Sequence, residues 1–158
     1  MSDTSNSVTR NGGPKHVSFS RGAGIRRHGR VVLVVEDDFD TQQMMRIILR
    51  KEYHVLLASN TAEAMKMIET CRVDVVLMDM SLGEKDSGLD ATRMIRTRWS
   101  MDQLPVIALT ACASRAQGMQ FLEAGGTDYM TKPFQVAALR ECMHRHTCEK
   151  TAAESSTC

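Results

Sequence analysis

Three acidic residues, Glu36, Asp37 and Asp38, follow directly on five branched aliphatic residues at 31–35. Adjacent carboxylates repel one another, and burying a carboxylate without a partner is costly. The cluster must therefore lie in water or beside a positive charge. Mg²⁺ prefers carboxylate oxygens, supplemented by water and phosphate oxygens. The sequence thus indicates a site for a divalent cation at the end of this apolar run.

Three further reactive side chains, Asp79, Thr110 and Lys132, each stand at or just after the end of a later apolar run. An aspartate can act as a nucleophile and form an aspartyl phosphate. A hydroxyl and a lysine beside it suit a phosphoryl group. Each residue alone is a weak signal, because an acid at a strand end is more often a solvated loop residue or a helix cap. Their joint occurrence predicts phosphoryl chemistry.

The apolar runs alternate with longer segments of helical period, which predicts five strands and five helices. The strands are expected at 31–36, 53–58, 74–78, 105–110 and 127–131. The helices are expected after 38, over about 61–70 with Thr61 as cap, around 89–95, over about 114–124, and after Pro133 to about His146.

This order, with strands apolar on both faces, implies an α/β fold in which one parallel sheet carries helices on both faces. Ligands of such sheets bind at the carboxyl ends of the strands. The acidic cluster, Asp79, Thr110 and Lys132 are therefore expected to meet at one edge of the sheet.

The two ends of the chain have a different composition. Residues 1–30 hold six basic residues against the single acid Asp3, and they lack apolar periodicity. We expect a disordered basic arm, which is either a solvated tail or a contact for nucleic acid, an anionic membrane or an acidic partner. A folded domain is expected over 31–147, followed by a short polar tail over 148–158.

The overall composition fits one globular domain, with 158 residues, a net charge of +1 and 42% hydrophobic residues. No stretch is long and apolar enough to span a bilayer or to act as a secretory signal, so a cytoplasmic location is expected. The five cysteines have no spacing typical of zinc or a redox dithiol, and none of the histidines has an evident site partner. Methionines within the predicted helices are expected to fill the core; they are Met44, Met45, Met65, Met67, Met94 and Met119.

Four stretches, VVLVVEDD, DVVLMDMSL, VIALTA and DYMTKPF, together resemble the receiver domain of two-component response regulators, the CheY-like family. The resemblance covers residues 31–147. It implies a flavodoxin-like (βα)5 fold with five parallel strands in the order 2-1-3-4-5.

The resemblance also implies roles for the acidic residues. Asp79 would accept a phosphoryl group from a phosphohistidine. Asp37, Asp79 and the backbone carbonyl of Ser81 would bind Mg²⁺, and Glu36 would act on the metal through water.

Further roles follow from the same resemblance. Lys132 would contact the phosphoryl oxygens, and the Lys132–Pro133 peptide bond would be cis. Thr110 would move to hydrogen-bond the phosphoryl group while Tyr129 rotates inward. Ser81 and Cys112 stand where residues of this family influence dephosphorylation.

One loop departs from the family pattern. The stretch MSLGEKDS between Asp79 and Gly88 is one residue longer than the usual spacing, and Gly83 replaces a common proline. The conformation of this loop is therefore not given by the resemblance.

The function that best fits these features is a stand-alone receiver that acts as a phosphorylation-activated switch. Its partners would be a histidine kinase or a histidine phosphotransfer protein, and a downstream protein bound at the face of the helix at 114–124, the strand at 127–131 and the last helix. We expect no DNA-binding domain after residue 147. Catalysis would be limited to Mg²⁺-dependent phosphotransfer and dephosphorylation of the protein itself.

Three alternatives are left open. The first is a receiver from a hybrid histidine kinase, the second is a degenerate receiver that only binds a partner, and the third is a phosphohydrolase acting on small molecules. The last needs a second acid beside the nucleophile, and Met80 and Ser81 stand there instead.

Overall fold

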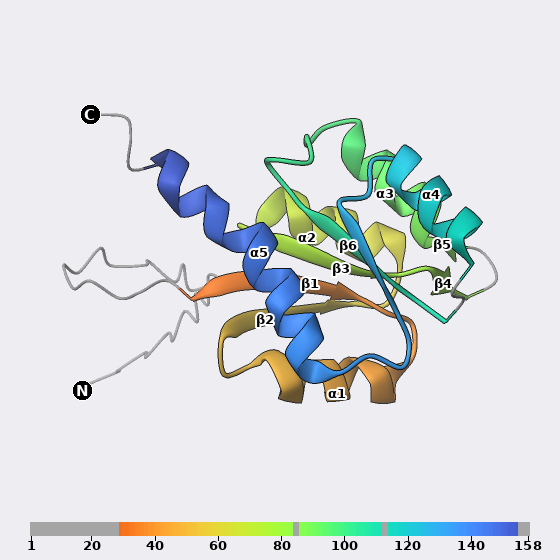
Figure 1. Cartoon of the computed structure of the whole chain (residues 1–158), viewed down its shortest axis with the longest axis horizontal. Coiled ribbons are helices and arrows are strands. Elements are labelled where there is room, and N and C mark those ends of the chain that lie inside the picture. Colours follow the sequence, from red (N-terminus) through yellow and green to blue (C-terminus); the bar gives the residue numbers. More distant parts are fainter. Residues whose placement is uncertain (1–28, 84–85, 112–113, 155–158) are drawn as a thin grey trace, which may run out of the picture.

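The computed structural model describes residues 29–83, 86–111 and 114–154. Its main sheet has five strands, β1 (Arg30–Val35), β2 (Tyr53–Ala58), β3 (Val75–Asp79), β6 (Val106–Thr110) and β7 (Asp128–Thr131). All neighbouring strands are parallel, in the order β2-β1-β3-β6-β7 (Figure 1). Counted along the chain this is 2-1-3-4-5, so the predicted flavodoxin-like sheet is confirmed.

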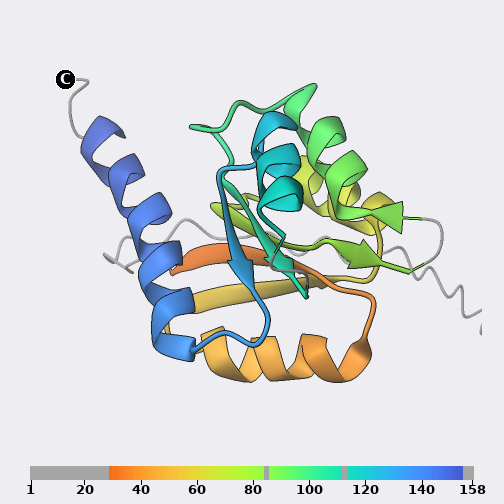
Figure 2. The ribbon, with the colours of Figure 1, turned by 45° about the vertical axis from the view of Figure 1, so that its right-hand side comes forward.

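Five helices cover the sheet: α1 (Phe39–Leu49), α2 (Thr61–Thr70), α3 (Gly88–Arg96), α4 (Arg115–Glu123) and α5 (Val136–Glu154). Alternate residues of each strand point to opposite faces, and the core is accordingly divided in two. On one face, strand residues such as Leu33 pack with α2, α3 and α4. On the other face, residues such as Val34 pack with α1 and α5 (Figure 2).

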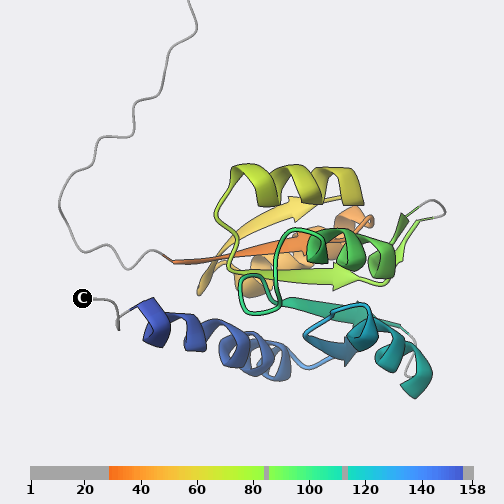
Figure 3. The ribbon, with the colours of Figure 1, turned by 90° about the horizontal axis from the view of Figure 1, so that it is seen from above.

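Two short strands, β4 (Ser81–Leu82) and β5 (Asp86–Ser87), form a small antiparallel hairpin that the sequence did not predict. Strands of two residues are too short to give a periodic pattern. The hairpin projects beyond the carboxyl end of β3, beside the start of α3 (Figure 3).

The ends of two helices differ from the sequence prediction. Thr61 is the first residue of α2 rather than its cap, because the Asn60 side chain accepts a 2.9 Å hydrogen bond from the N–H of Glu63. Helix α5 was predicted to end near His146 but continues to Glu154. The added segment contains no Gly or Pro and includes Ala, Glu and Lys, which favour helix where apolar periodicity gives no signal.

The proposed basic arm lies outside the described residues, except for Gly29 and for Arg30, which begins β1. Among the described residues, no helix has the length and apolar character needed to cross a membrane.

The prediction that the helical methionines fill the core is only partly correct. Met45 is fully buried, and Met65 and Met67 pack against the core. Met44 and Met94, in contrast, are each 48% exposed. Met119 is exposed as well. Methionine occurs often enough at helix surfaces that residue type alone does not assign the face.

Arg96 connects three segments on the α3 side of the sheet. Its guanidinium donates to the carbonyl oxygens of Gly125 at 2.6 Å and Leu104 at 2.9 Å. Longer bonds reach the carbonyls that follow α3. Burial lowers the pKa of Arg96. The side chain thus satisfies several backbone acceptors and ties the end of α3 to the turn between α4 and β7.

Replacing Arg96 with Ala is expected to lower the free energy of unfolding by about 1.5–3 kcal/mol or more, because bonds from a charged donor to partly buried carbonyls are lost. Urea denaturation followed by circular dichroism measures this. Arg93→Ala on the same helix is the control, since Arg93 is exposed and pairs with the exposed Asp90 one turn away. Equal losses in the two variants would contradict the assigned role of Arg96.

Candidate phosphoryl-transfer site

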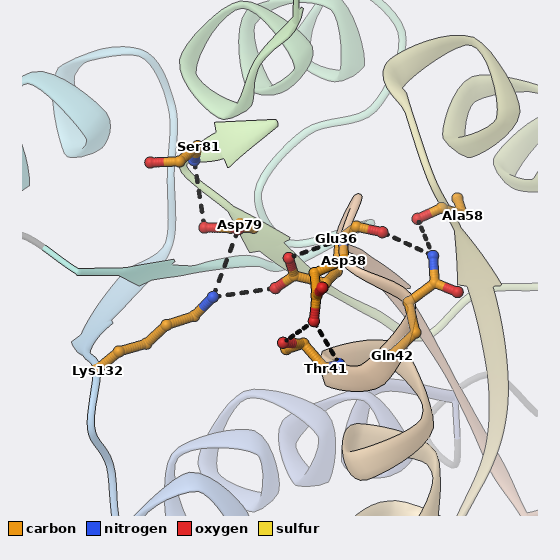
Figure 4. A network of polar contacts seen from close by, with 8 residues as sticks. All are labelled: Glu36, Asp38, Thr41, Gln42, Ala58, Asp79, Ser81 and Lys132. Atoms are coloured by element: carbon orange, nitrogen blue, oxygen red, sulfur yellow. Dashed lines mark hydrogen bonds and ion pairs between the residues drawn. The ribbon is translucent and has the colours of Figure 1, made fainter. Parts of the chain in front are cut away.

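The ends of four parallel strands meet at one edge of the sheet and carry the residues singled out in the sequence. Val35 ends β1 just before the acidic cluster, and Asp79 is the last residue of β3. Thr110 ends β6 opposite Thr131 of β7. Lys132 follows directly. The parallel register therefore brings the predicted residues to one edge, where Figure 4 shows Glu36, Asp79 and Lys132 side by side.

Lys132 lies between two carboxylates that the sequence places far apart. Its Nζ is 3.0 Å from Glu36 Oε2 and 3.4 Å from Asp79 Oδ2. Glu36 is 3% exposed and Asp79 is 6% exposed. Two buried carboxylates are tolerable here because one ammonium contacts both of them. Lys132 thus supplies part of the positive charge that the acids at the end of this apolar strand require.

The pKa values in this group follow from burial and charge. Burial raises the pKa of Glu36, and the charge of Asp79 adds to this, which together outweigh the hydrogen bond from Lys132. Burial alone would lower the pKa of Lys132, but its hydrogen bond with Glu36 and the charge of Asp79 raise it. Lys132 is therefore firmly cationic at neutral pH.

Asp37 completes a group of oxygen ligands. The carboxylates of Glu36, Asp37 and Asp79 place ligand oxygens within 4.8 Å of one another, and Asp37 is exposed. One ammonium among three carboxylates leaves two negative charges uncompensated at this edge. A hard divalent cation matches both the charge and the all-oxygen donor set, so these residues fit Mg²⁺.

Asp38 has a structural role next to the site. Its side chain caps α1 by accepting a 2.7 Å hydrogen bond from the N–H of Thr41 and a 2.6 Å bond from the Thr41 hydroxyl. These bonds lower the pKa of Asp38. Asp38 is thus the N-cap residue of α1, the ordinary role of an acid at the end of a strand.

Gln42 is a site-supporting residue that the sequence analysis missed. Its buried Nε2 donates to the Glu36 carbonyl at 2.6 Å, with longer contacts to the Ala58 carbonyl and Ser59 Oγ at 3.4 Å each. The amide holds the ends of β1 and β2 against α1 (Figure 4). The available signal was a polar side chain on the face of α1 that also carries Met45 and Leu49.

The loop after Asp79 has a defined conformation in its described part. The backbone N–H of Ser81 donates to Asp79 Oδ1 at 3.2 Å, which orients the carboxylate. Gly83 has φ +61, in the left-handed region that proline cannot adopt. A Cβ on Gly83 would lie 3.5 Å from Asp37 Oδ2. The replacement of the usual proline thus accompanies the β4–β5 hairpin beside the acidic group.

Gly88 is a second residue whose importance the sequence did not reveal. A Cβ at this position would lie 2.3 Å from the Asp79 carbonyl oxygen and 2.9 Å from Met80 Cα. The start of α3 therefore approaches the end of β3 more closely than any residue with a side chain allows. A close packing of this kind leaves no pattern in a single sequence.

Thr110 and Tyr129 lie on the other side of Asp79 and line one pocket of about 410 Å³. Thr110 is buried, whereas Tyr129 is 38% exposed. The Tyr129 ring lies over Gly118 of α4, where a Cβ would come within 2.6 Å of the ring carbon Cζ. The aromatic ring thus occupies a gap that the missing side chain of Gly118 creates.

The remaining predicted positions are placed as follows. The Lys132–Pro133 peptide bond is cis, as the sequence predicted. Cys112 lies outside the described residues. His146 does have a partner, contrary to the sequence analysis, because its Nε2 is 3.0 Å from Asp128 Oδ2.

The sheet order, the acidic group and the lysine define a doubly wound α/β protein whose polar site lies at the carboxyl ends of the strands, where such folds bind ligands. The family model for the response regulator receiver domain matches residues 32–144. The chain therefore belongs to the response regulator receiver domain family.

Known relatives agree with this assignment. The response regulator MprA of Mycolicibacterium vanbaalenii is 35% identical over 130 residues, which are 79% of this chain and 55% of MprA. The chain thus spans about half the length of this relative. The receiver domain of the sensor histidine kinase PA1611 from Pseudomonas aeruginosa, solved with magnesium in its active site cleft, is 37% identical with a TM-score of 0.67; the match covers 75% of this chain and 98% of that domain.

A third relative is known in a complex. The Saccharomyces cerevisiae receiver domain of Ssk1, solved with the histidine phosphotransfer protein Ypd1, gives a TM-score of 0.68 at 28% identity. The match covers 79% of this chain and 94% of the solved one.

Gly88→Ala is expected to destabilise the protein by about 1–3 kcal/mol, because the added methyl group overlaps the backbone at Asp79. It should also lower Mg²⁺ affinity, since the Asp79 carboxylate moves with its backbone. Denaturant unfolding and calorimetric Mg²⁺ titration measure the two effects. Gly29→Ala is the matched control, because nothing lies within 4 Å of a Cβ there. Unchanged stability and Mg²⁺ affinity in Gly88→Ala would show that the close approach is not required.

Proposed function

We propose that this receiver domain is a signalling switch that accepts a phosphoryl group on Asp79 from a phosphohistidine. The observation that carries the proposal is the contact of one cation, Lys132, with both Glu36 and Asp79 beside the exposed carboxylate of Asp37. This arrangement supplies a nucleophile, a fixed positive charge and a divalent-cation site within one small volume.

The roles of the side chains in the proposed transfer follow from their positions. An Asp79 carboxylate oxygen forms a bond to phosphorus while the phosphorus–nitrogen bond of the donor histidine breaks. The nitrogen keeps the bonding electron pair and takes a proton, so neutral imidazole leaves. Asp79 is already oriented by the Ser81 N–H, and Lys132 lies ready to neutralise the charge on the transferred group.

Glu36, Asp37, Asp79 and the Ser81 carbonyl would hold Mg²⁺. When bound, the metal supplies positive charge that offsets the carboxylates and the phosphoryl oxygens. The PA1611 receiver, with magnesium in its cleft, supports this assignment. The domain would catalyse only the gain and loss of its own phosphoryl group and would not act as an enzyme on a separate substrate.

The switch would operate through Thr110 and Tyr129. The hydroxyl of Thr110 would move toward a phosphoryl group on Asp79, and Tyr129 would turn into the pocket that both residues line. The position of Tyr129 over Gly118 supports this, because its ring is partly exposed and lines that pocket. The face formed by α4, β7 and α5 would then change and bind a downstream protein.

Incubation with acetyl phosphate and Mg²⁺ tests the proposed function. We expect a phosphate-sized mass increase that is labile in base and needs Mg²⁺, and that is absent in Asp79→Asn. Asp90→Asn, an exposed acid on α3, serves as the control and should remain a substrate. If the wild-type protein binds Mg²⁺ but gains no phosphate from acetyl phosphate or phosphorylated donors, the proposal fails in favour of a degenerate binding module.

The phosphodonor would dock on the exposed side of α1. Phe39 is 68% exposed and Ile47 is 61% exposed. Met44 is three residues before Ile47 and therefore lies on the same side of the helix as Ile47. Phe39 follows the cap residue Asp38 and is therefore next to the site. The exposed pair Met44 and Ile47, with the exposed Phe39 at the start of the helix, gives α1 an apolar surface that suits the docking of a helical donor protein. The Ssk1 receiver in complex with Ypd1 supports a phosphotransfer protein as donor.

Met44→Glu is expected to slow transfer from a phosphorylated histidine phosphotransfer protein by at least about tenfold, because a charge enters an apolar contact. Acetyl phosphate should still phosphorylate the variant at the wild-type rate. Met94→Glu on α3 is the matched control, since Met94 has the same exposure as Met44. Equal transfer rates for Met44→Glu and Met94→Glu would place the docking surface elsewhere.

The proposal is compatible with at least two settings of the domain. One is a receiver that signals by protein contact alone. The other is a receiver within a hybrid histidine kinase, which the 37% identity with the PA1611 receiver favours. Either would work in the cytoplasm, where phosphohistidine donors are produced. Phosphotransfer to Asp79 is common to both.

A further inference from the structure

A second cluster of potential metal ligands lies at the opposite end of β7 from the phosphoryl-transfer site. Asp128 begins β7, whereas Lys132 follows its last residue. A strand rises about 3.3 Å per residue, so roughly 13 Å separates these two positions. Cys142 and His146 are four residues apart on α5 and therefore share one side of that helix. Both face Asp128.

The distances within the cluster are short. His146 Nε2 is 3.0 Å from Asp128 Oδ2, and Cys142 Sγ is 3.5 Å from the same oxygen. One ligand atom from each residue lies within 4.8 Å of the other two. Zinc binds oxygen and nitrogen at about 2.0 Å and sulfur at about 2.3 Å, with tetrahedral angles between its ligands. In that geometry a nitrogen and an oxygen ligand are about 3.3 Å apart, and a sulfur and an oxygen ligand are about 3.5 Å apart. The two distances to Asp128 Oδ2 are already close to these values.

The donor set differs in kind from that of the Asp79 site. Thiolate, imidazole and carboxylate are the ligands of Zn²⁺ and related transition metals, whereas Mg²⁺ selects oxygen alone. Cys142 is buried, but the side chains of His146 and Asp128 are 21% and 29% exposed. An ion can therefore enter from solvent and keep water as its fourth ligand.

We propose that Asp128, Cys142 and His146 form a binding site for Zn²⁺ or a similar divalent transition metal that joins β7 to α5. A metal–sulfur bond replaces the Cys142 S–H bond, and the displaced proton goes to solvent. The metal also takes one oxygen of Asp128 and Nε2 of His146, in the neutral tautomer that carries its proton on Nδ1. Since β7 and α5 belong to the proposed output face, a metal here would fix their relative position.

The metal-free cluster is held by hydrogen bonds with a protonated thiol. Burial, followed by the charge of Asp128, raises the pKa of the Cys142 thiol to about 12. Burial would also raise the pKa of Asp128, but the bonds from His146, the Tyr129 N–H and Cys142 lower it. Arg145, whose Nη1 is 3.8 Å from Asp128 Oδ2, is the cation that opposes a metal here. Its side chain is 62% exposed and free to turn toward solvent.

Co²⁺ is the probe, because a cobalt–thiolate bond gives a near-ultraviolet charge-transfer absorption that carboxylate ligands do not give. The full chain, with Cys71, Cys112, Cys148 and Cys158 changed to Ser, is titrated with Co²⁺ in excess Mg²⁺ and a phosphine reductant. Only Cys142 remains as thiol. We expect the absorption to appear with one equivalent of Co²⁺ and to disappear when Zn²⁺ is added.

Three variants test which residues bind. Cys142→Ser removes the absorption, and His146→Gln weakens binding by at least about tenfold. Arg145→Ala is expected to tighten binding about fivefold, because a nearby positive charge is removed without loss of a ligand. Asp37→Asn, which disrupts the Mg²⁺ site, leaves the titration unchanged.

The proposal is overturned if Co²⁺ gives no charge-transfer absorption in a protein with native circular dichroism. It is equally overturned if the absorption survives Cys142→Ser, or if His146→Gln and Arg145→Ala both bind Co²⁺ as the parent does. The acetyl phosphate experiment is independent of these outcomes, because its residues lie at the other end of the sheet.

Discussion

The parallel register of β1, β3, β6 and β7 is the constraint on which the rest of the structure depends. Parallel strands all end at the same edge, so residues nearly a hundred positions apart, such as Glu36 and Lys132, come within 3.0 Å. The helices that make parallel strands possible also cover both faces of the sheet. Polar side chains can therefore gather only at the edges, and the carboxyl edge holds the acids and the lysine.

Electrostatic interactions then determine which of the acidic side chains at this edge can be buried. The buried carboxylates of Glu36 and Asp79 share the single ammonium of Lys132, and Asp37 remains at the surface. Hydrogen bonds from neutral groups hold the acidic residues in place despite this excess of negative charge. Gln42 donates to the backbone of Glu36, and the Ser81 N–H donates to the Asp79 carboxylate. Such a site is stable as it stands and is still attractive to cations.

The sequence predicted the main sheet, its five helices and the residues at its carboxyl edge, because each rests on a local pattern. Apolar runs mark β1 and β3, and the position of Asp79 relative to its strand follows from chain order alone. Gln42 and Gly88 were missed because their importance lies in contacts across elements, which no periodicity records. The β4–β5 hairpin and the contact of His146 with Asp128 were missed for the same reason: short strands and partners from separate elements leave no spacing to detect.

The Arg96 contacts have a mechanical consequence for α4. The bond from Arg96 to the Gly125 carbonyl fixes the turn at the carboxyl end of that helix to α3, and the N–H of Gly126 is bonded to the Phe121 carbonyl. The amino end of α4 has no such anchor to α3 among the described contacts. If α4 tilts, its carboxyl end at Gly125 therefore stays in place and its amino end moves. The displacement of α4 is then largest at its amino end, which follows Thr110 in the chain and lies near the Asp79 edge.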